Sequence, residues 1–173
     1  NTVAGILADV TARGDDAVLE YTRKFDCPSL EALQLSTAAR DTLAEQVTAE
    51  VQDAIKTAFN NVKQFHEAQY PEDIRLTTTP GVVCEQRFTG REAVGLYIPG
   101  GSAPLPSTVM MLGVPSLVAG CKRRVLCTPP NAEQQIAPEI AFAAKLCGIE
   151  EIYLCGGAQA IAAMAFGTNT ITK

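Results

Sequence analysis

The sequence predicts an α/β protein in which an N-terminal helical region precedes a layer of parallel strands and helices. Three observations carry this prediction. A helical hydrophobic period runs to about residue 69, a β-favouring stretch covers residues 74–88, and three strand–helix pairs follow between residues 92 and 167. Strands that alternate with helices of this length form parallel sheets with right-handed crossovers. We therefore predict a helical region with a β-rich connector over residues 1–90 and a Rossmann-like βαβαβα domain over residues 91–173.

The helical region shows amphipathic patterns with recognisable ends. One helix is expected to begin at Asp15, with this residue as its cap, and Ser36 or Thr37 is expected to cap the next one. Residues 49–69 predict a long amphipathic helix. It ends before Pro71, because the residue that precedes a proline is disfavoured in helical conformation.

The remaining elements follow from turn residues and apolar runs. Pro80-Gly81 predicts a turn between extended segments over residues 74–79 and 82–88. Beyond them, apolar runs alternate with helical patterns that glycines close. The predicted order is a strand over 93–98, a helix over 106–119, a strand over 124–128, a helix over 137–147, a strand over 151–155 and a helix over 158–166.

Composition and charge exclude several classes of protein. The 173 residues are 47% hydrophobic and 19% charged, which is typical of a globular chain. The net charge of −5 argues against a nucleic-acid partner, and the basic cluster 122–124 is expected to be a solvated corner. The best apolar stretch, residues 109–119, is too short for a membrane span, and the first residues lack the pattern of a signal peptide. A start at Asn1 rather than Met suggests trimming at the front.

The cysteines and the single histidine do not form a recognisable metal or catalytic motif. No two cysteines have the C-x₂-C spacing of a zinc site, and the only histidine is His66, expected at the surface. Most of the cysteines lie in apolar patterns, so we expect reduced thiols packed in the core of a cytoplasmic protein. The six are Cys27, Cys84, Cys121, Cys127, Cys147 and Cys155.

Two glycine-rich loops are candidates for a ligand site. Residues 99–107 and 156–159 each follow a predicted parallel strand, and ligands of open parallel sheets bind beyond the carboxyl ends of the strands. Neither loop matches G-x-G-x-x-G, so a tight turn without a ligand is an equally good interpretation. Tyr97 at the end of the first strand could face a base or ribose, and Gln159 could hydrogen-bond a ligand. From the residues alone, a packing role for Tyr97 and a capping role for Gln159 are slightly favoured.

A family resemblance decides between these interpretations. The segment GLYIPGGSAPLPSTV at residues 95–109 is similar to the signature of the histidinol dehydrogenases. Matches continue on both sides of it and cover essentially the whole chain. They include Arg13-Gly14-Asp15, Lys24-Phe25-Asp26, residues 61–69, Met111-Leu112, residues 119–122, 126–130, 146–148, 156–163 and 165–168.

The resemblance implies a fold, an activity and two binding residues. It implies an aldehyde-dehydrogenase-like fold and a zinc-dependent cytoplasmic enzyme that oxidises L-histidinol to L-histidine through histidinaldehyde, in two NAD-linked steps. This reaction is the last step of histidine biosynthesis, and the family's enzyme is a homodimer. The tyrosine of G-L-Y-I-P-G-G and the glutamine of G-G-A-Q-A contact NAD in the family. These residues are Tyr97 and Gln159 here, which favours binding roles for both.

The resemblance also implies what residues 1–173 lack. After the F-G-T segment the family supplies a further NAD-contacting Asn, then a Gln and a His for zinc, a Glu-His pair for acid–base chemistry, and a later Asp and His. A chain with one histidine does not carry this set. We therefore expect the N-terminal portion of such an enzyme, inactive alone, with no catalytic or zinc-binding residues of its own.

Two other interpretations remain. The chain could be a non-catalytic nucleotide-binding or dimerisation module of the same fold. It could also be a thiol-based aldehyde dehydrogenase with Cys121 or Cys155 as nucleophile. The second requires an exposed thiol with a lowered pKa, whereas both cysteines are expected to be buried.

Overall fold

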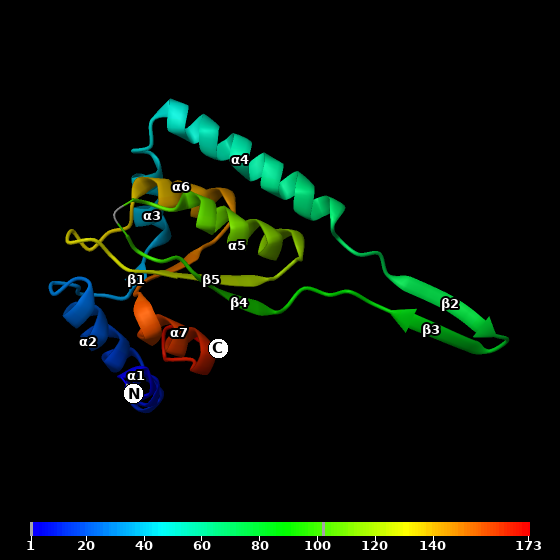
Figure 1. The fold of residues 1–173 in the computed structure, drawn as a ribbon, viewed down its shortest axis with the longest axis horizontal. Coiled ribbons are helices and arrows are strands. Elements are labelled where there is room, and N and C mark those ends of the chain that lie inside the picture. Colours follow the sequence, from blue (N-terminus) through cyan, green and yellow to red (C-terminus); the bar gives the residue numbers. More distant parts are fainter. Residues whose placement is uncertain (1, 102) are drawn as a thin grey trace.

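A computed structural model describes residues 2–101 and 103–173, and Figure 1 shows its fold. Strands and helices alternate in the second half of the described chain, as the sequence predicts. The helices are α1 (Thr2–Arg13), α2 (Asp15–Phe25), α3 (Thr37–Ala44), α4 (Ala49–Ala68), α5 (Pro106–Val118), α6 (Pro138–Leu146) and α7 (Gly157–Phe166). The strands are β1 (Gln34–Leu35), β2 (Ile74–Thr79), β3 (Val82–Gln86), β4 (Ala93–Tyr97), β5 (Arg123–Thr128) and β6 (Glu151–Leu154).

A four-stranded sheet in the order β1-β6-β5-β4 forms the centre of the molecule. β4, β5 and β6 are parallel, and Leu126 of β5 lies between Leu96 and Ile152 of its neighbours. The predicted parallel βαβαβα layer is therefore confirmed. The antiparallel edge strand β1 was not predicted, because two residues, Gln34 and Leu35, are too few to show a period.

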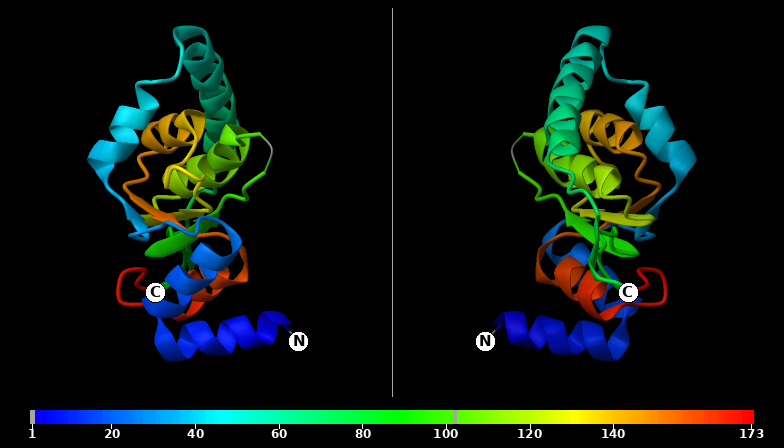
Figure 2. Two further views of the ribbon diagram at one scale, coloured as in Figure 1. Left: turned by 90° about the vertical axis from the view of Figure 1, so that its left-hand side faces the viewer. Right: turned by 90° about the vertical axis from the view of Figure 1, so that its right-hand side faces the viewer.

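Helices cover both faces of this sheet, as parallel sheets require (Figures 1 and 2). α5 and α6 pack on one face, with α3 and α4 outside them, and α7 packs on the other, with α1 and α2 against it. Gly113 permits the close approach of α5 to α6, because a Cβ there would lie 2.9 Å from the Sγ of Cys147. One hydrophobic core extends from Ile6 to Ile171. Both predicted regions, 1–90 and 91–173, contribute to it.

The hairpin of β2 and β3 projects away from this body (Figure 1). Every residue of both strands is exposed, and a bulge lies between Thr77 and Thr79. α4 leads into the hairpin and has one buried residue, Ile55. Within the described residues, no helix has the length and apolar character needed to cross a membrane.

The helix caps differ in part from the prediction. Ser36 caps α3, since its side-chain oxygen accepts a hydrogen bond from the N–H of Ala39 at 3.1 Å. The prediction that Asp15 is a cap is wrong. Gly14 occupies the cap position of α2, and the carboxylate of Asp15 accepts hydrogen bonds from the backbone N–H and the hydroxyl of Thr170 at 3.0 and 2.9 Å. Asp15 thus ties the start of α2 to the segment after α7.

Candidate functional site

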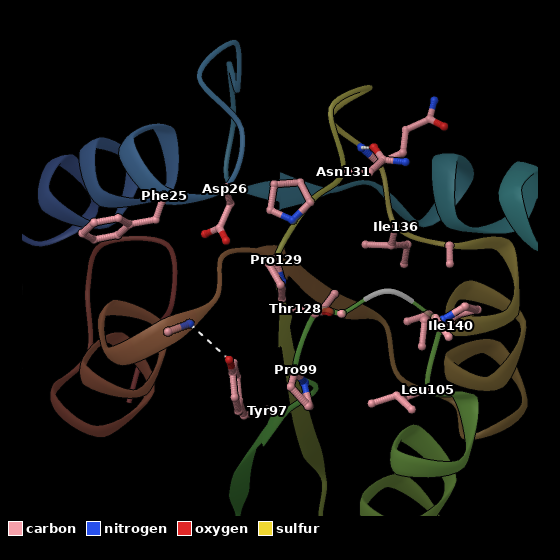
Figure 3. Close-up of a pocket in the computed structure, with 18 residues that line it drawn as sticks. Phe25, Asp26, Tyr97, Pro99, Leu105, Thr128, Pro129, Asn131, Ile136 and Ile140 are labelled. Atoms are coloured by element: carbon pink, nitrogen blue, oxygen red, sulfur yellow. Dashed lines mark hydrogen bonds between the residues drawn. The ribbon is translucent and has the colours of Figure 1, made fainter.

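A cavity of about 560 Å³ lies at the carboxyl ends of the parallel strands (Figure 3). Its walls come from the end of α2, from the loops that follow β4 and β5, and from residues at or next to the starts of three helices. Loops at this edge of a parallel sheet are where ligands bind. The cavity therefore occupies the position at which the sequence predicts a site.

Tight packing around Pro129 brings the strand-end loops together. A Cβ on Gly100 would lie 2.5 Å from the Cγ of Pro129, and a Cβ on Gly156 would lie 2.9 Å from the Cβ of this proline. Glycine at these two positions thus lets the loops after β4 and β6 close against the loop after β5. Ser102, which belongs to the predicted glycine-rich loop 99–107, lies outside the described residues.

Tyr97 is held at the wall of this cavity by the start of α7. It is the last residue of β4, and its side chain lines the cavity. Its hydroxyl oxygen accepts a hydrogen bond from the backbone N–H of Gly157 at 3.2 Å (Figure 3). Gly157 has a φ of 61°, a conformation that glycine adopts without steric cost. The hydrogen bond thus holds the Tyr97 ring beside the N-terminus of α7.

Gln159 lies behind the cavity wall. It belongs to the first turn of α7 and is 2% exposed. Its Oε1 lies 2.8 Å from the point where a Cβ on Gly157 would stand, so the amide is directed toward the helix start. The cavity lining in the described chain includes Gly157 but not Gln159. Contact between Gln159 and a ligand stays a prediction.

Three helix N-termini converge on the cavity. Leu105 precedes α5, Ala137 precedes α6 and Gly157 begins α7, and all three residues line the space. The first N–H groups of a helix lack partners within the helix, and the helix dipole places partial positive charge there. Such ends favour phosphate and carboxylate groups. The cavity can therefore receive an anionic ligand through the backbone.

The side chains of the wall contribute few polar groups. Asp26, at the C-terminal cap of α2, is the single charged residue among the described residues that line it, and burial raises the pKa of its carboxyl group. The side chain of Asn131 is engaged within its own loop, because its Oδ1 accepts from the N–H groups of Glu133 and Gln135. Thr128 adds a hydroxyl at the end of β5.

The cysteines do not supply a nucleophile to this site. Five of the six are buried and Cys84 is exposed; all six are free thiols. A hydrogen bond with Cys127, together with burial, raises the pKa of Cys155 well above its usual value. Cys121 is 5% exposed. The hypothesis of a thiol mechanism therefore lacks the accessible thiolate that it needs.

The described residues do not fit a zinc ion. Among them, no group of three or more His, Cys, Asp or Glu side chains is placed to hold a metal. His66 is half-buried on α4, with its ring at an edge-on angle to Phe65, and lines a separate cavity of about 290 Å³ near the base of the hairpin. We therefore assign no metal-dependent step to these residues.

Comparison with known proteins identifies the family. The sequence profile of the histidinol dehydrogenases matches residues 1–173. The chain belongs to the histidinol dehydrogenase family. It is 50% identical over 171 residues to a histidinol dehydrogenase of Vibrio parahaemolyticus, and 52% identical over 169 residues to that of Colwellia psychrerythraea. These alignments cover 99% and 98% of this chain and 39% of each relative.

A crystal structure of histidinol dehydrogenase from Elizabethkingia anophelis has the same fold over this region. The TM-score is 0.92 at 42% identity, and the match covers 100% of this chain and 40% of that one. The chain thus spans about two fifths of the length of the histidinol dehydrogenases that it matches. The resemblance that the sequence motifs indicated is confirmed.

Proposed function

We propose that this chain forms the N-terminal, NAD-binding part of a histidinol dehydrogenase, an oxidoreductase that converts L-histidinol to L-histidine through histidinaldehyde. Membership of the family carries this proposal, since the matched profile spans residues 1–173. The cavity supports it, because three helix starts and a strand-end tyrosine surround a space of about 560 Å³.

NAD would be held by the backbone ends and by two side chains. Pro106 and Pro138 begin α5 and α6 and carry no N–H, and the N–H of Gly157 donates to Tyr97. The N–H groups of the residues that follow in the first turns of α5, α6 and α7 would therefore bind the phosphates of NAD. The ring of Tyr97 would contact the cofactor from a position fixed by the N–H of Gly157. The amide of Gln159 would reach it from beneath the first turn of α7. NAD itself supplies the hydride acceptor for alcohol and aldehyde oxidation.

The rest of the activity would require groups outside residues 1–173. We propose that the zinc ligands and the acid–base residues lie there, because the described residues form no metal cluster. We also propose a cytoplasmic homodimer. The sheet order β6-β5-β4 corresponds to the first three strands of a doubly wound sheet, which supports an aldehyde-dehydrogenase-like fold for the complete domain.

Substitution of Tyr97 and Gln159 in the full-length enzyme tests the cofactor site. Tyr97→Ala and Gln159→Ala should each raise the KM for NAD by several-fold or more, because each removes a contact worth on the order of 1 kcal/mol. The KM for histidinol should change far less. Tyr70→Ala is a matched control, since Tyr70 is 48% exposed and lies outside the cavity. Wild-type NAD kinetics in both variants would contradict the assignment.

A further inference from the structure

The proposed NAD cavity has an uneven distribution of charge. Among the described residues that line it there is no lysine, arginine or histidine, and the single charged residue is Asp26. The positive potential for the cofactor's phosphates therefore comes from helix N-termini rather than from side chains. A ligand in this cavity meets a negative carboxylate that no lining cation neutralises.

The backbone around Asp26 is well fixed. Its N–H donates a hydrogen bond to the carbonyl oxygen of Thr22 at 2.9 Å, which closes the last turn of α2.

The carboxylate of Asp26 has no partner among the residues that the structure describes. Figure 3 shows it pointing into the cavity, between the start of α7 and Pro129. Within the described chain, no group donates a hydrogen bond to this carboxylate. Asp26 is exposed, so solvent reaches its carboxylate in this structure. An ionised carboxylate only accepts hydrogen bonds, so a ligand that covers it must bring donors.

The two nearest basic residues in the sequence do not form an ion pair with the Asp26 carboxylate. The Nζ of Lys24 lies over the ring of Phe25, 5.4 Å from its centroid, and does not line the cavity. The guanidinium of Arg23 donates to the carbonyl oxygen of Leu30 at 2.7 Å. Both basic residues of the last turn of α2 are thus outside the space into which Asp26 points.

The sheet does not supply an acid where dinucleotide-binding folds usually have one. In those folds a carboxylate near the end of the second strand binds the ribose hydroxyls of NAD. The second parallel strand here is β5, which ends at Thr128, and the loop that follows begins Pro129-Pro130-Asn131, so neither supplies an acidic residue there. Asp26 brings a carboxylate to the same cavity from a different element, the end of α2.

We infer that Asp26 accepts hydrogen bonds from the ribose hydroxyls of the bound dinucleotide and makes the site selective for NAD over NADP. This inference rests on the proposed function. A ribose diol offers the donors that the carboxylate lacks. A 2′-phosphate would remove one donor and place two more negative charges against Asp26, with no lining cation to offset them.

Equilibrium binding to the full-length protein tests this role without a measurement of turnover. Calorimetric titration would use NAD, NADP and 2′-deoxy-NAD as ligands. In the wild type, NADP and the deoxy analogue should each bind about tenfold more weakly than NAD, or worse. Asp26→Asn should weaken NAD binding by several-fold and reduce the ratio of NAD to NADP affinity by about tenfold or more. Asp16→Asn, an exposed acid of the same helix, should leave all three affinities unchanged.

The outcomes separate this inference from the proposed function. If the wild type binds NAD but discriminates against neither NADP nor the deoxy analogue, the inference is wrong and the NAD site stands. The same holds if a folded Asp26→Asn protein keeps full discrimination. If the wild type does not bind NAD, the proposed function itself fails, and the inference with it. Should Asp26→Asn not fold by circular dichroism, the deoxy analogue on wild-type protein still decides.

Discussion

The parallel sheet and the β2–β3 hairpin are both built from apolar and β-branched residues, yet their surroundings are opposite. Leu126 in β5 is 0% exposed, and helices cover both faces of its sheet. Leu76 in β2 is 59% exposed, and every residue of the hairpin is open to solvent. The same residue types therefore give a buried core in one region and an open surface in the other.

This difference shows what a hydrophobic pattern determines. Alternation of apolar and polar residues and β-propensity predict that a segment is extended, but they do not determine whether other elements bury it. An isolated two-stranded hairpin is marginally stable in water, whereas a parallel sheet between helices shares in the stability of the whole domain. We therefore expect the two regions to respond differently to chemical probes and to substitution.

Thiol labelling should show the largest contrast. Cys84 in the hairpin is exposed, whereas Cys127 in β5 is 0% exposed. A buried thiol reacts only after the surrounding structure opens, and opening a core strand costs a large part of the free energy of unfolding. In the 173-residue chain under native conditions, Cys84 should react at least about a thousandfold faster than Cys127.

Mass spectrometry of the labelled protein over time would measure both rates. Cys84→Ser should remove the fast phase and leave the slow one unchanged. Protection of Cys84 equal to that of Cys127 would contradict the open hairpin.

Truncation of equivalent leucines gives the next largest contrast. Leu126→Ala should lower the free energy of unfolding by about 3 kcal/mol, because it leaves a cavity in the hydrophobic core on one face of the sheet. Leu76→Ala should lower it by less than about 0.5 kcal/mol, because its side chain is already in water. Urea denaturation of both variants measures the difference. Equal losses would show that the hairpin is packed in solution.

Much of the fold could be predicted from the sequence, because local patterns determine it. The hairpin strand β2 has the predicted bounds, and α7 begins one residue earlier than predicted, at Gly157. β1 could not be predicted, since two residues pair only because β6 is already in place. Asp15 was misassigned for a similar reason. Its partner Thr170 is 155 residues away in the sequence.

The candidate site was predictable to a lesser extent. Strand-end loops predicted where the cavity lies, and Tyr97 does line it. The sequence gives no sign that Gln159 is 2% exposed behind Gly157, because that depends on how α7 packs. It also assigns no role to Asp26. That residue reaches the cavity only because α2 packs against α7, more than a hundred residues further along the chain.

Removal of an ion pair should show the smallest contrast, and it depends on pH. In the sheet, the guanidinium of Arg123 binds both carboxylate oxygens of Glu151, at 2.7 and 2.5 Å, with side-chain exposures of 25% and 31%. In the hairpin, Arg75 binds Glu85 at 2.6 Å, with exposures of 71% and 29%. The basic cluster 122–124 was expected to be solvated, but Arg123 within it forms an ion pair with Glu151.

Arg123 lowers the pKa of Glu151 below its ordinary value of 4.5. A carboxyl group with a lowered pKa in the folded state stabilises that state above the unfolded pKa, and this stabilisation is lost as the pH falls through the folded pKa. Glu151→Gln should therefore lower the free energy of unfolding by up to about 1 kcal/mol at neutral pH, a modest value because solvent screens the pair. The deficit should shrink below about pH 4.5, where wild-type Glu151 itself begins to be protonated when unfolded.

Glu85→Gln, the control in the hairpin, should lower the free energy of unfolding by less than about 0.5 kcal/mol at either pH, because the hairpin adds little to global stability. Urea denaturation at pH 7 and at pH 4 would compare the two variants, and a pH-independent deficit in Glu151→Gln would show that packing, not the ion pair, causes the loss.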